Sequence, residues 1–242
     1  MNPNPAARAE LVPAGKLRVG VNLGNFLLVN KDAATGELRG VVPDLAQELA
    51  RRLGGVPFEL IGYPGAGQVA DAAATGAWDV GFIGAEPQRA AEITFTTAYL
   101  EIPATYLVPA GSPIRSLPEV DRPGIRIAVA ARSAYDLFLS RNLKHAQLLR
   151  AEGIPASYDL FVAEKLDVLS GLLPRLTADV ARLPGARILE GKFTAIQQAI
   201  GTPKARGAGA AWLREFVADI KASGFVAQAI ERHGVQGVTV AP

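Results

Sequence analysis

Arg89 is the side chain of this sequence best suited to bind a small anion. It follows a predicted buried strand over residues 80–83 and a Gly/Pro turn over residues 84–87, and it lies on a predicted short helix. The planar guanidinium can hold a carboxylate through two parallel hydrogen bonds. The start of a helix would add N–H groups and the positive end of a dipole. The alternative is a surface arginine behind a tight turn.

The elements before Arg89 predict a sheet that would present it. Strands and helices alternate here, with strands over residues 17–22, 57–61 and 80–83 and helices over residues 43–53 and 67–75. Leu45, Leu49 and Leu53 give the first helix an apolar stripe. This alternation is typical of an α/β sheet with mostly parallel strands. Ligands of such sheets bind beyond the carboxyl ends of the strands, where residues 22–26 and 84–89 both lie.

A second α/β unit is predicted after a Pro/Gly/Ser-rich passage over residues 110–124. Its elements are strands at 105–109, 125–130, 187–189 and 193–200, a helix at 134–143, a helix and strand within 159–169, and a helix at 172–183 interrupted near Pro174. Residues 201–203 predict a break, and helices over residues 208–223 and 226–233 complete the first unit. Residues 1–15 predict a loose arm with one helical turn.

These units predict two lobes, the first from residues 1–106 with 201–242 and the second from residues 107–200. Two connections between lobes would make a hinge with a cleft.

Composition narrows the function classes. The chain has 242 residues, of which 49% are hydrophobic and 20% charged, with a net charge of +2 and no cysteine. No basic cluster indicates nucleic-acid binding, and no apolar run of about 18 residues predicts a membrane-spanning helix. The lack of cysteine excludes disulfides and thiolate metal sites. No phosphate loop, nucleophile elbow or metal-ligand cluster is present, so we expect no cofactor and no metal.

The N-terminal segment lacks the basic start and apolar core of a secretory signal. We therefore expect a periplasmic protein if a signal peptide has been removed, and otherwise a cytoplasmic one.

Several motifs, in order and at matching spacing, resemble one family. They are residues 15–20 (GKLRVG), 40–54 (GVVPDLAQELARRLG), 76–80 (GAWDV), 86–90 (EPQRA), 95–99 (FTTAY) and 129–136 (VAARSAYD). The chain resembles the type II solute-binding proteins of ABC transporters, in the polar amino-acid group. The resemblance runs from Gly15 to about His233.

The resemblance implies an α/β fold of the periplasmic-binding-protein type, a two-lobe clamp whose lobes are mostly parallel sheets flanked by helices. It also implies a substrate-binding component that captures a small carboxylate or amino-acid-like solute between its lobes. ABC permease subunits would be its partners. The family arginine that holds the ligand carboxylate matches Arg89. The family aspartate that holds the α-amino group falls on Leu172, which would leave a buried ammonium unpaired.

Other site positions also depart from the family pattern. Gly84 occupies the place of a hydroxyl residue, and Arg132 replaces the glycine of a G-S/T pair. A carboxylate with an apolar or second acidic part therefore fits better than a zwitterionic amino acid. Arg132 and Arg175 could each serve a second anionic group, and the alternative for both is a solvated surface arginine.

The remaining candidates have structural alternatives as well. Ser133 and Tyr135 could donate hydrogen bonds to the ligand, and Ser133 could equally be a helix N-cap. The first lobe meets ligand in the family where this chain has Asn22, Asn25 and Phe26. Asn25 could instead serve the turn, and Phe26 could pack in the core. Glu86 is the acid nearest Arg89 in sequence, and its expected role is that of an ion-pair partner.

Two other function classes are compatible with this resemblance. Some proteins of this fold resemble cyclohexadienyl dehydratases, which use a glutamate as general acid. That position corresponds to Arg175, with no carboxylate to replace it, so we expect no catalytic residue and no enzyme activity. A ligand sensor would use the same clamp, with closure detected by a regulatory partner rather than by a permease.

Overall fold

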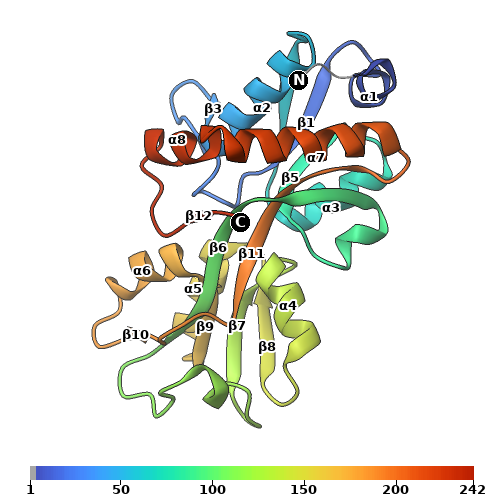
Figure 1. The fold of residues 1–242 in the computed structure, drawn as a ribbon. Coiled ribbons are helices and arrows are strands. Elements are labelled where there is room, and N and C mark those ends of the chain that lie inside the picture. The colour runs from blue at the N-terminus through green and yellow to red at the C-terminus, as the bar shows by residue number, and fades with distance from the viewer. Residues whose placement is uncertain (1–3) are drawn as a thin grey trace. The chain divides into compact units, whose positions relative to one another are not determined.

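A computed structural model describes residues 4–242 of the chain (Figure 1). The chain divides into two compact units. Unit 1 comprises residues 1–101 and 197–242, and unit 2 comprises residues 102–196. The lobe limits predicted from sequence, near 106 and 200, differ from these limits by a few residues at both crossings. Within residues 4–242, no helix is both long and apolar enough to span a membrane.

Unit 1 is built on a sheet whose strands run in the order β4-β1-β5-β11. Strands β1 and β4 are parallel, β1 and β5 are parallel, and β11 is antiparallel to β5. The elements of unit 1 are α1 (Pro5–Leu11), β1 (Leu17–Asn22), β2 (Asn30–Lys31), β3 (Leu38–Arg39), α2 (Val41–Arg52), β4 (Phe58–Tyr63), α3 (Ala66–Ala74), β5 (Val80–Gly84), η1 (Arg89–Ala91), α7 (Gly207–Ala222), α8 (Phe225–Arg232) and β12 (Thr239–Val240).

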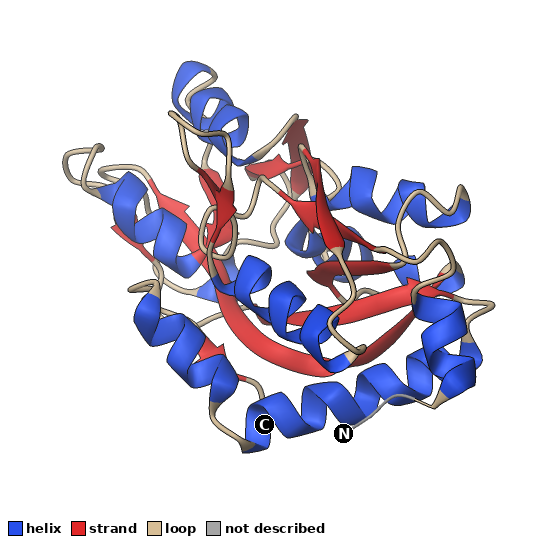
Figure 2. Ribbon diagram, turned by 90° about the horizontal axis from the view of Figure 1, so that it is seen from above, coloured by secondary structure: helices blue, strands red, loops and turns tan. Residues whose placement is uncertain are grey.

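In unit 2, strands β9, β7 and β8 of the same strand order are parallel neighbours. Its elements are η2 (Leu117–Glu119), β7 (Arg126–Ala130), α4 (Ala134–Asn142), β8 (Gln147–Ala151), α5 (Ile154–Ala163), β9 (Val168–Leu172), α6 (Leu173–Val180) and β10 (Arg187–Ile188). Two long strands, β6 (Ile93–Val108) and β11 (Thr194–Pro203), pass from one unit into the other. They lie side by side in Figure 2, and β6 is antiparallel to β9. The predicted α/β fold is confirmed, but the sheet is mixed, because β6 and β11 run antiparallel to the strands beside them.

The cores explain why these elements form. The apolar stripe of α2 is realised, because Leu45, Leu49 and Leu53 are fully buried. In unit 1, Trp78 is also fully buried, and its indole Nε1 donates to the Val69 carbonyl at 2.9 Å. Tyr158, Phe161 and Leu176 are among the residues that form the core of unit 2.

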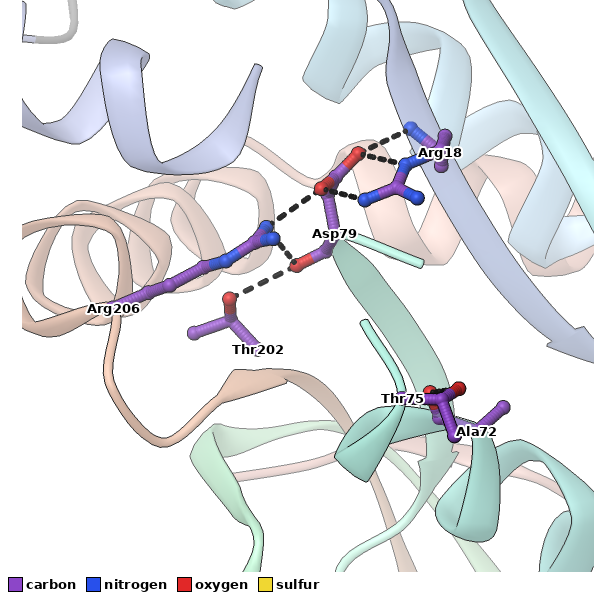
Figure 3. Close-up of polar contacts among 6 residues, drawn as sticks. All are labelled: Arg18, Ala72, Thr75, Asp79, Thr202 and Arg206. Atoms are coloured by element: carbon purple, nitrogen blue, oxygen red, sulfur yellow. Dashed lines mark hydrogen bonds and ion pairs between the residues drawn. The ribbon is translucent and has the colours of Figure 1, made fainter. Parts of the chain in front are cut away.

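A buried carboxylate ties the two chain segments of unit 1 together (Figure 3). Asp79 precedes β5 and accepts hydrogen bonds from Arg18 of β1, while Arg206 donates to it from the residue before α7. The hydroxyl of Thr202 donates to the Asp79 carbonyl at 2.9 Å. The opposite charges pair where β1, β5 and the returning chain meet.

Several element predictions are wrong. Residues 201–203 do not break the chain but complete β11, and β8 was not predicted. The helical turn predicted within residues 1–15 is present as helix α1, which is seven residues long, and residues 1–3 lie outside the described part. Pro174 does not interrupt a helix. It lies in the first turn of α6, where its missing N–H costs no hydrogen bond.

Candidate functional site

Arg89 lies at the carboxyl end of β5. All five residues of that strand are buried, and Arg89 itself is 6% exposed. Its NH1 atom donates to the carbonyl of Gly84, the last residue of β5, at 2.6 Å. The alternative of a surface arginine is therefore wrong. The Gly84 bond fixes the direction of the guanidinium, and two-point recognition of a carboxylate requires a fixed planar fork.

The short helix contributes less than predicted. It is a single 3₁₀ turn, η1, which starts at Arg89. The Glu86 carbonyl accepts from the backbone N–H of Arg89 at 2.9 Å and of Ala90 at 3.2 Å. These two N–H groups are thus already bonded and are not the free donors that the sequence predicted at a helix start. The Arg89 side chain stays the predicted anion-binding group of this turn.

The turn after β1 lies beside the Arg89 turn, because Val21 of β1 pairs with Phe82 of parallel β5. Asn22 Oδ1 accepts from the Gly24 N–H at 3.0 Å. Gly24 is required there, since a Cβ would lie 2.8 Å from the Pro64 carbonyl oxygen. Asn22 therefore has a structural role in shaping this turn.

Asn25 and Phe26 follow in the same turn. The Asn25 carbonyl accepts from the Leu28 and Val29 N–H groups at 3.0 Å, as the turn alternative predicted. Its side-chain Oδ1 is buried without a hydrogen-bond partner. Phe26 is 37% exposed, so the alternative that it packs in the core is wrong. An unpaired buried acceptor and an exposed ring thus lie next to the Arg89 turn.

In unit 2, Arg132 adopts a left-handed backbone conformation with φ of 57° at the end of β7. Glycine adopts such a conformation without strain, which agrees with the glycine of the family pattern at this position. The side chain of Arg132 is exposed, while its backbone N–H donates to Asp136 Oδ2 at 2.7 Å. The tight turn is held by Asp136, a residue that the sequence analysis did not single out.

Helix α4 begins directly after this turn. Ser133 is its N-cap, because its hydroxyl accepts from the Asp136 N–H at 3.0 Å, as the structural alternative predicted. Tyr135 is 3% exposed and its hydroxyl has no hydrogen-bond partner. Burial raises the pKa of Tyr135, so its phenol stays protonated at neutral pH. Asp136 is nearly buried and also pairs with Arg150 at 3.0 Å. The Ser/Asp spacing was a sequence signal for this cap.

Leu172 and Arg175 lie where β9 leads into α6. Leu172 is 5% exposed and is the residue before the helix, with no side-chain cap. The Arg175 Nε atom donates to both carboxylate oxygens of Asp179, at 3.0 and 2.8 Å. The Arg175 side chain is only 19% exposed, so a purely solvated surface role is excluded.

The structure thus groups the predicted residues into two sets. Unit 1 brings together two neighbouring turns, and the candidates on them are Asn22, Asn25, Phe26, Gly84, Glu86 and Arg89. Unit 2 places its set at the carboxyl ends of the parallel strands β7 and β9, with Arg132, Ser133, Tyr135, Leu172 and Arg175. One charged residue that the sequence analysis did not single out, Glu101, lies at the point where β6 leaves unit 1.

Comparison with known proteins settles the family. Residues 17–236 match the model of the bacterial extracellular solute-binding proteins, family 3. The chain belongs to this family. It is therefore a family 3 solute-binding protein with the fold of the periplasmic binding proteins, of the polar amino-acid type. Among curated protein sequences, none matches it.

Solved structures of the same fold cover almost the whole of this family 3 protein. A variant of ArgBP from T. maritima is 21% identical, with 94% of this chain and 99% of that chain covered and a TM-score of 0.77. The solute receptor for L-cysteine of Neisseria gonorrhoeae is 20% identical, with 96% and 95% covered and a TM-score of 0.79. An ancestral amino acid-binding protein, a precursor of cyclohexadienyl dehydratase, is 22% identical, with 93% and 98% covered and a TM-score of 0.75.

Proposed function

We propose that this family 3 protein captures a small solute bearing a carboxylate and delivers it to an ABC transporter, with Arg89 as the carboxylate anchor. The observation that carries the proposal is the buried Arg89 guanidinium, held 2.6 Å from the Gly84 carbonyl at the carboxyl end of β5. Ligands of parallel sheets bind at this end of the strands. A buried, oriented arginine there favours recognition of a planar anion over a structural ion pair on the surface.

We propose a ligand whose remaining part is apolar or carries a second acidic group. Leu172 is buried and apolar where the family pattern has the aspartate that pairs with an ammonium. A buried ammonium without such a partner is strongly disfavoured. The cation that the sequence predicts for a second acidic group is Arg132. The competing ligand class is an amino acid, since ArgBP from T. maritima has been crystallised with arginine.

We further propose binding without catalysis, action outside the cytoplasmic membrane and ABC permease subunits as partners. The family name, which describes extracellular solute-binding proteins, supports this location. The only acid on the Arg89 turn is Glu86, which is 9% exposed and whose backbone carbonyl shapes the turn. Closure of two lobes over the ligand stays a prediction from the sequence.

A thermal-shift panel tests the ligand class. The panel sets succinate, malate and 3-phenylpropionate beside glutamate, phenylalanine, arginine and cysteine. A ligand at about 100 times its Kd stabilises the folded protein by about 2.7 kcal/mol. For a chain of this size, each kcal/mol raises Tm by about 2–4 °C, so a true ligand raises it by about 5–10 °C.

We expect an acid without an amino group to give the largest shift, and Arg89→Ala to abolish that shift. The matched control is Arg214→Ala, which removes an exposed arginine from α7 of the same unit. A response confined to amino acids would contradict the proposed ligand class. An acid response that survives in Arg89→Ala would contradict the proposed anchor.

A further inference from the structure

The C-terminal strand β12 holds β6 at the point where β6 leaves unit 1. Thr239 of β12 pairs antiparallel with Glu101, the last residue of this segment of unit 1. Lys221 on α7 donates to the Ala98 carbonyl at 3.2 Å and to the Pro242 carbonyl at 2.6 Å. One lysine thus fastens β6 and the residues that follow β12 to the same helix, and Figure 1 shows β12 beside β6. The backbone at Glu101 is therefore fixed within unit 1.

The side chain of Glu101 reaches the other crossing strand. Gln197, the residue at which the chain re-enters unit 1, donates from Nε2 to Glu101 Oε1 at 2.8 Å. Both residues are half-buried. A hydrogen bond to a carboxylate is about twice as strong as one between neutral groups. This bond therefore fixes β11 against β6 where each strand meets the boundary of unit 1.

Gln197 passes this constraint to the candidate site through its backbone. Its carbonyl accepts from the Ala85 N–H at 2.8 Å, and its neighbour Gln198 pairs with Gly84. The Gly84 carbonyl in turn accepts from Arg89 NH1 at 2.6 Å. Four consecutive contacts, all within unit 1, thus lead from β12 to the guanidinium of Arg89.

We propose that Glu101 and Gln197 are positioning residues for Arg89. The Glu101–Gln197 bond fixes the position of the Gln197 carbonyl. That carbonyl holds the turn at Gly84 and Ala85, and the Gly84 carbonyl in this turn directs the Arg89 guanidinium. Because this bond joins the two strands at the unit boundary, a change in their relative position moves Arg89. The role of Arg89 as carboxylate anchor rests on the proposed function, whereas the contacts that position its side chain do not.

Exchange of the two side chains gives a sharp test. Gln197→Glu places two carboxylates against each other and breaks the bond by repulsion. In the double variant Glu101→Gln with Gln197→Glu, the amide and the carboxylate change places and the bond can form again. Gln197→Ala removes the bond without adding charge and serves if Gln197→Glu does not fold. The matched control is Gln147→Glu, which makes the same substitution and adds the same single negative charge at an exposed position of unit 2.

The readout is the Nε–Hε resonance of Arg89 in protein labelled with ¹⁵N-arginine, recorded without ligand and assigned by its loss in Arg89→Lys. We expect Gln197→Glu to shift this resonance, the double variant to restore it and the control to leave it unchanged. A resonance unmoved by Gln197→Glu and by Gln197→Ala would overturn the proposal. So would a shift that the double variant does not reverse, since that indicates a general disturbance.

Binding of succinate and 3-phenylpropionate by the same variants separates the two proposals. We expect Gln197→Glu to weaken the binding of these acids about tenfold relative to the double variant. If the Arg89 resonance behaves as expected but Arg89→Ala leaves acid binding unchanged, the proposed function fails and the positioning role stands. If Arg89→Ala abolishes acid binding but the Arg89 resonance is unchanged in the Gln197 variants, only the positioning role fails.

Discussion

The strongest stability prediction concerns Asp79→Asn. The Asp79 carboxylate is fully buried and accepts hydrogen bonds from the Arg18 backbone N–H at 3.0 Å, Nε at 3.0 Å and NH2 at 2.8 Å, and from Arg206 NH1 at 2.8 Å (Figure 3). Asparagine keeps the shape of the side chain but removes the negative charge. Its amide N–H₂ group also points donors at guanidinium donors. Two arginines then lose their shared counter-charge.

The expected cost is about 3 kcal/mol of unfolding free energy. Breaking a buried ion pair by removing one partner costs about 3–5 kcal/mol. The lower end applies because Arg18 and Arg206 side chains are 27% and 17% exposed and regain hydration. At about 2–4 °C per kcal/mol, Tm should fall by about 6–12 °C at pH 7.

The difference between wild type and Asp79→Asn should shrink in acid. Burial alone would raise the pKa of Asp79, but the hydrogen bonds from Arg18 and Arg206 outweigh it and hold that pKa below its usual value. A carboxyl with a lower pKa in the folded state stabilises the protein above its unfolded pKa, about 3.9. That stability is lost as the pH falls through the folded pKa. The difference should therefore be constant between pH 5 and 7 and decline below about pH 4.

Calorimetric melting of both proteins at pH 7, 5, 4 and 3 measures this difference. The control is Glu37→Gln, which breaks the exposed Glu37–Arg39 pair and should change Tm little. A loss of less than about 1 kcal/mol of unfolding free energy at pH 7 would refute the reasoning, because the Asp79 ion pairs would then contribute no more than exposed surface pairs do. A difference that stays constant down to pH 3 would refute the pKa argument.

Three further predictions concern other positions. Leu172→Asp should raise the affinity for amino acids relative to acids of the same carbon skeleton. The aspartate can also cap α6, because Leu172 provides no side-chain cap. An unchanged ligand preference in calorimetric titration would contradict the match of Leu172 to the family aspartate. Ser133→Ala should lower the unfolding free energy by about 1 kcal/mol through loss of the α4 N-cap, and no change in urea denaturation would count against that role. Gly40→Ala should lower the unfolding free energy by more than about 1 kcal/mol, because φ of Gly40 is 134° and a Cβ would collide with the Leu28 carbonyl. A melting temperature equal to that of wild type would exclude this clash.

Local patterns in the sequence determine much of unit 1. Strand β1 has the predicted bounds, and α2 follows from the spacing of its leucines. Strand β8 was not predicted because its sequence, QLLRA, has two adjacent leucines instead of an alternation of apolar and polar residues. Residues 201–203 resembled a turn, yet Gly201 is needed within β11 because a Cβ would collide with Ile93. That collision depends on tertiary packing, which local sequence does not contain.

The candidate site divides in the same way. The place of Arg89 followed from a strand, a glycine and a turn, and the Ser133 cap followed from residue type. The bond from Arg89 to Gly84 and the link from Gln197 to Ala85 could not be predicted. The second joins positions more than a hundred residues apart, and such pairs form only once the sheet order is set.

The central claim is that Arg89 holds a ligand carboxylate, and one titration tests it most directly. Succinate and 3-phenylpropionate, each beside its uncharged amide, are titrated calorimetrically into wild type, Arg89→Ala and Arg214→Ala. Loss of one partner of a buried charged pair costs at least about 2 kcal/mol, or about 30-fold in affinity. We predict that wild type and Arg214→Ala prefer an acid over its amide by at least that factor, and that Arg89→Ala loses the preference. Equal acid-over-amide preference in wild type and Arg89→Ala would contradict the account.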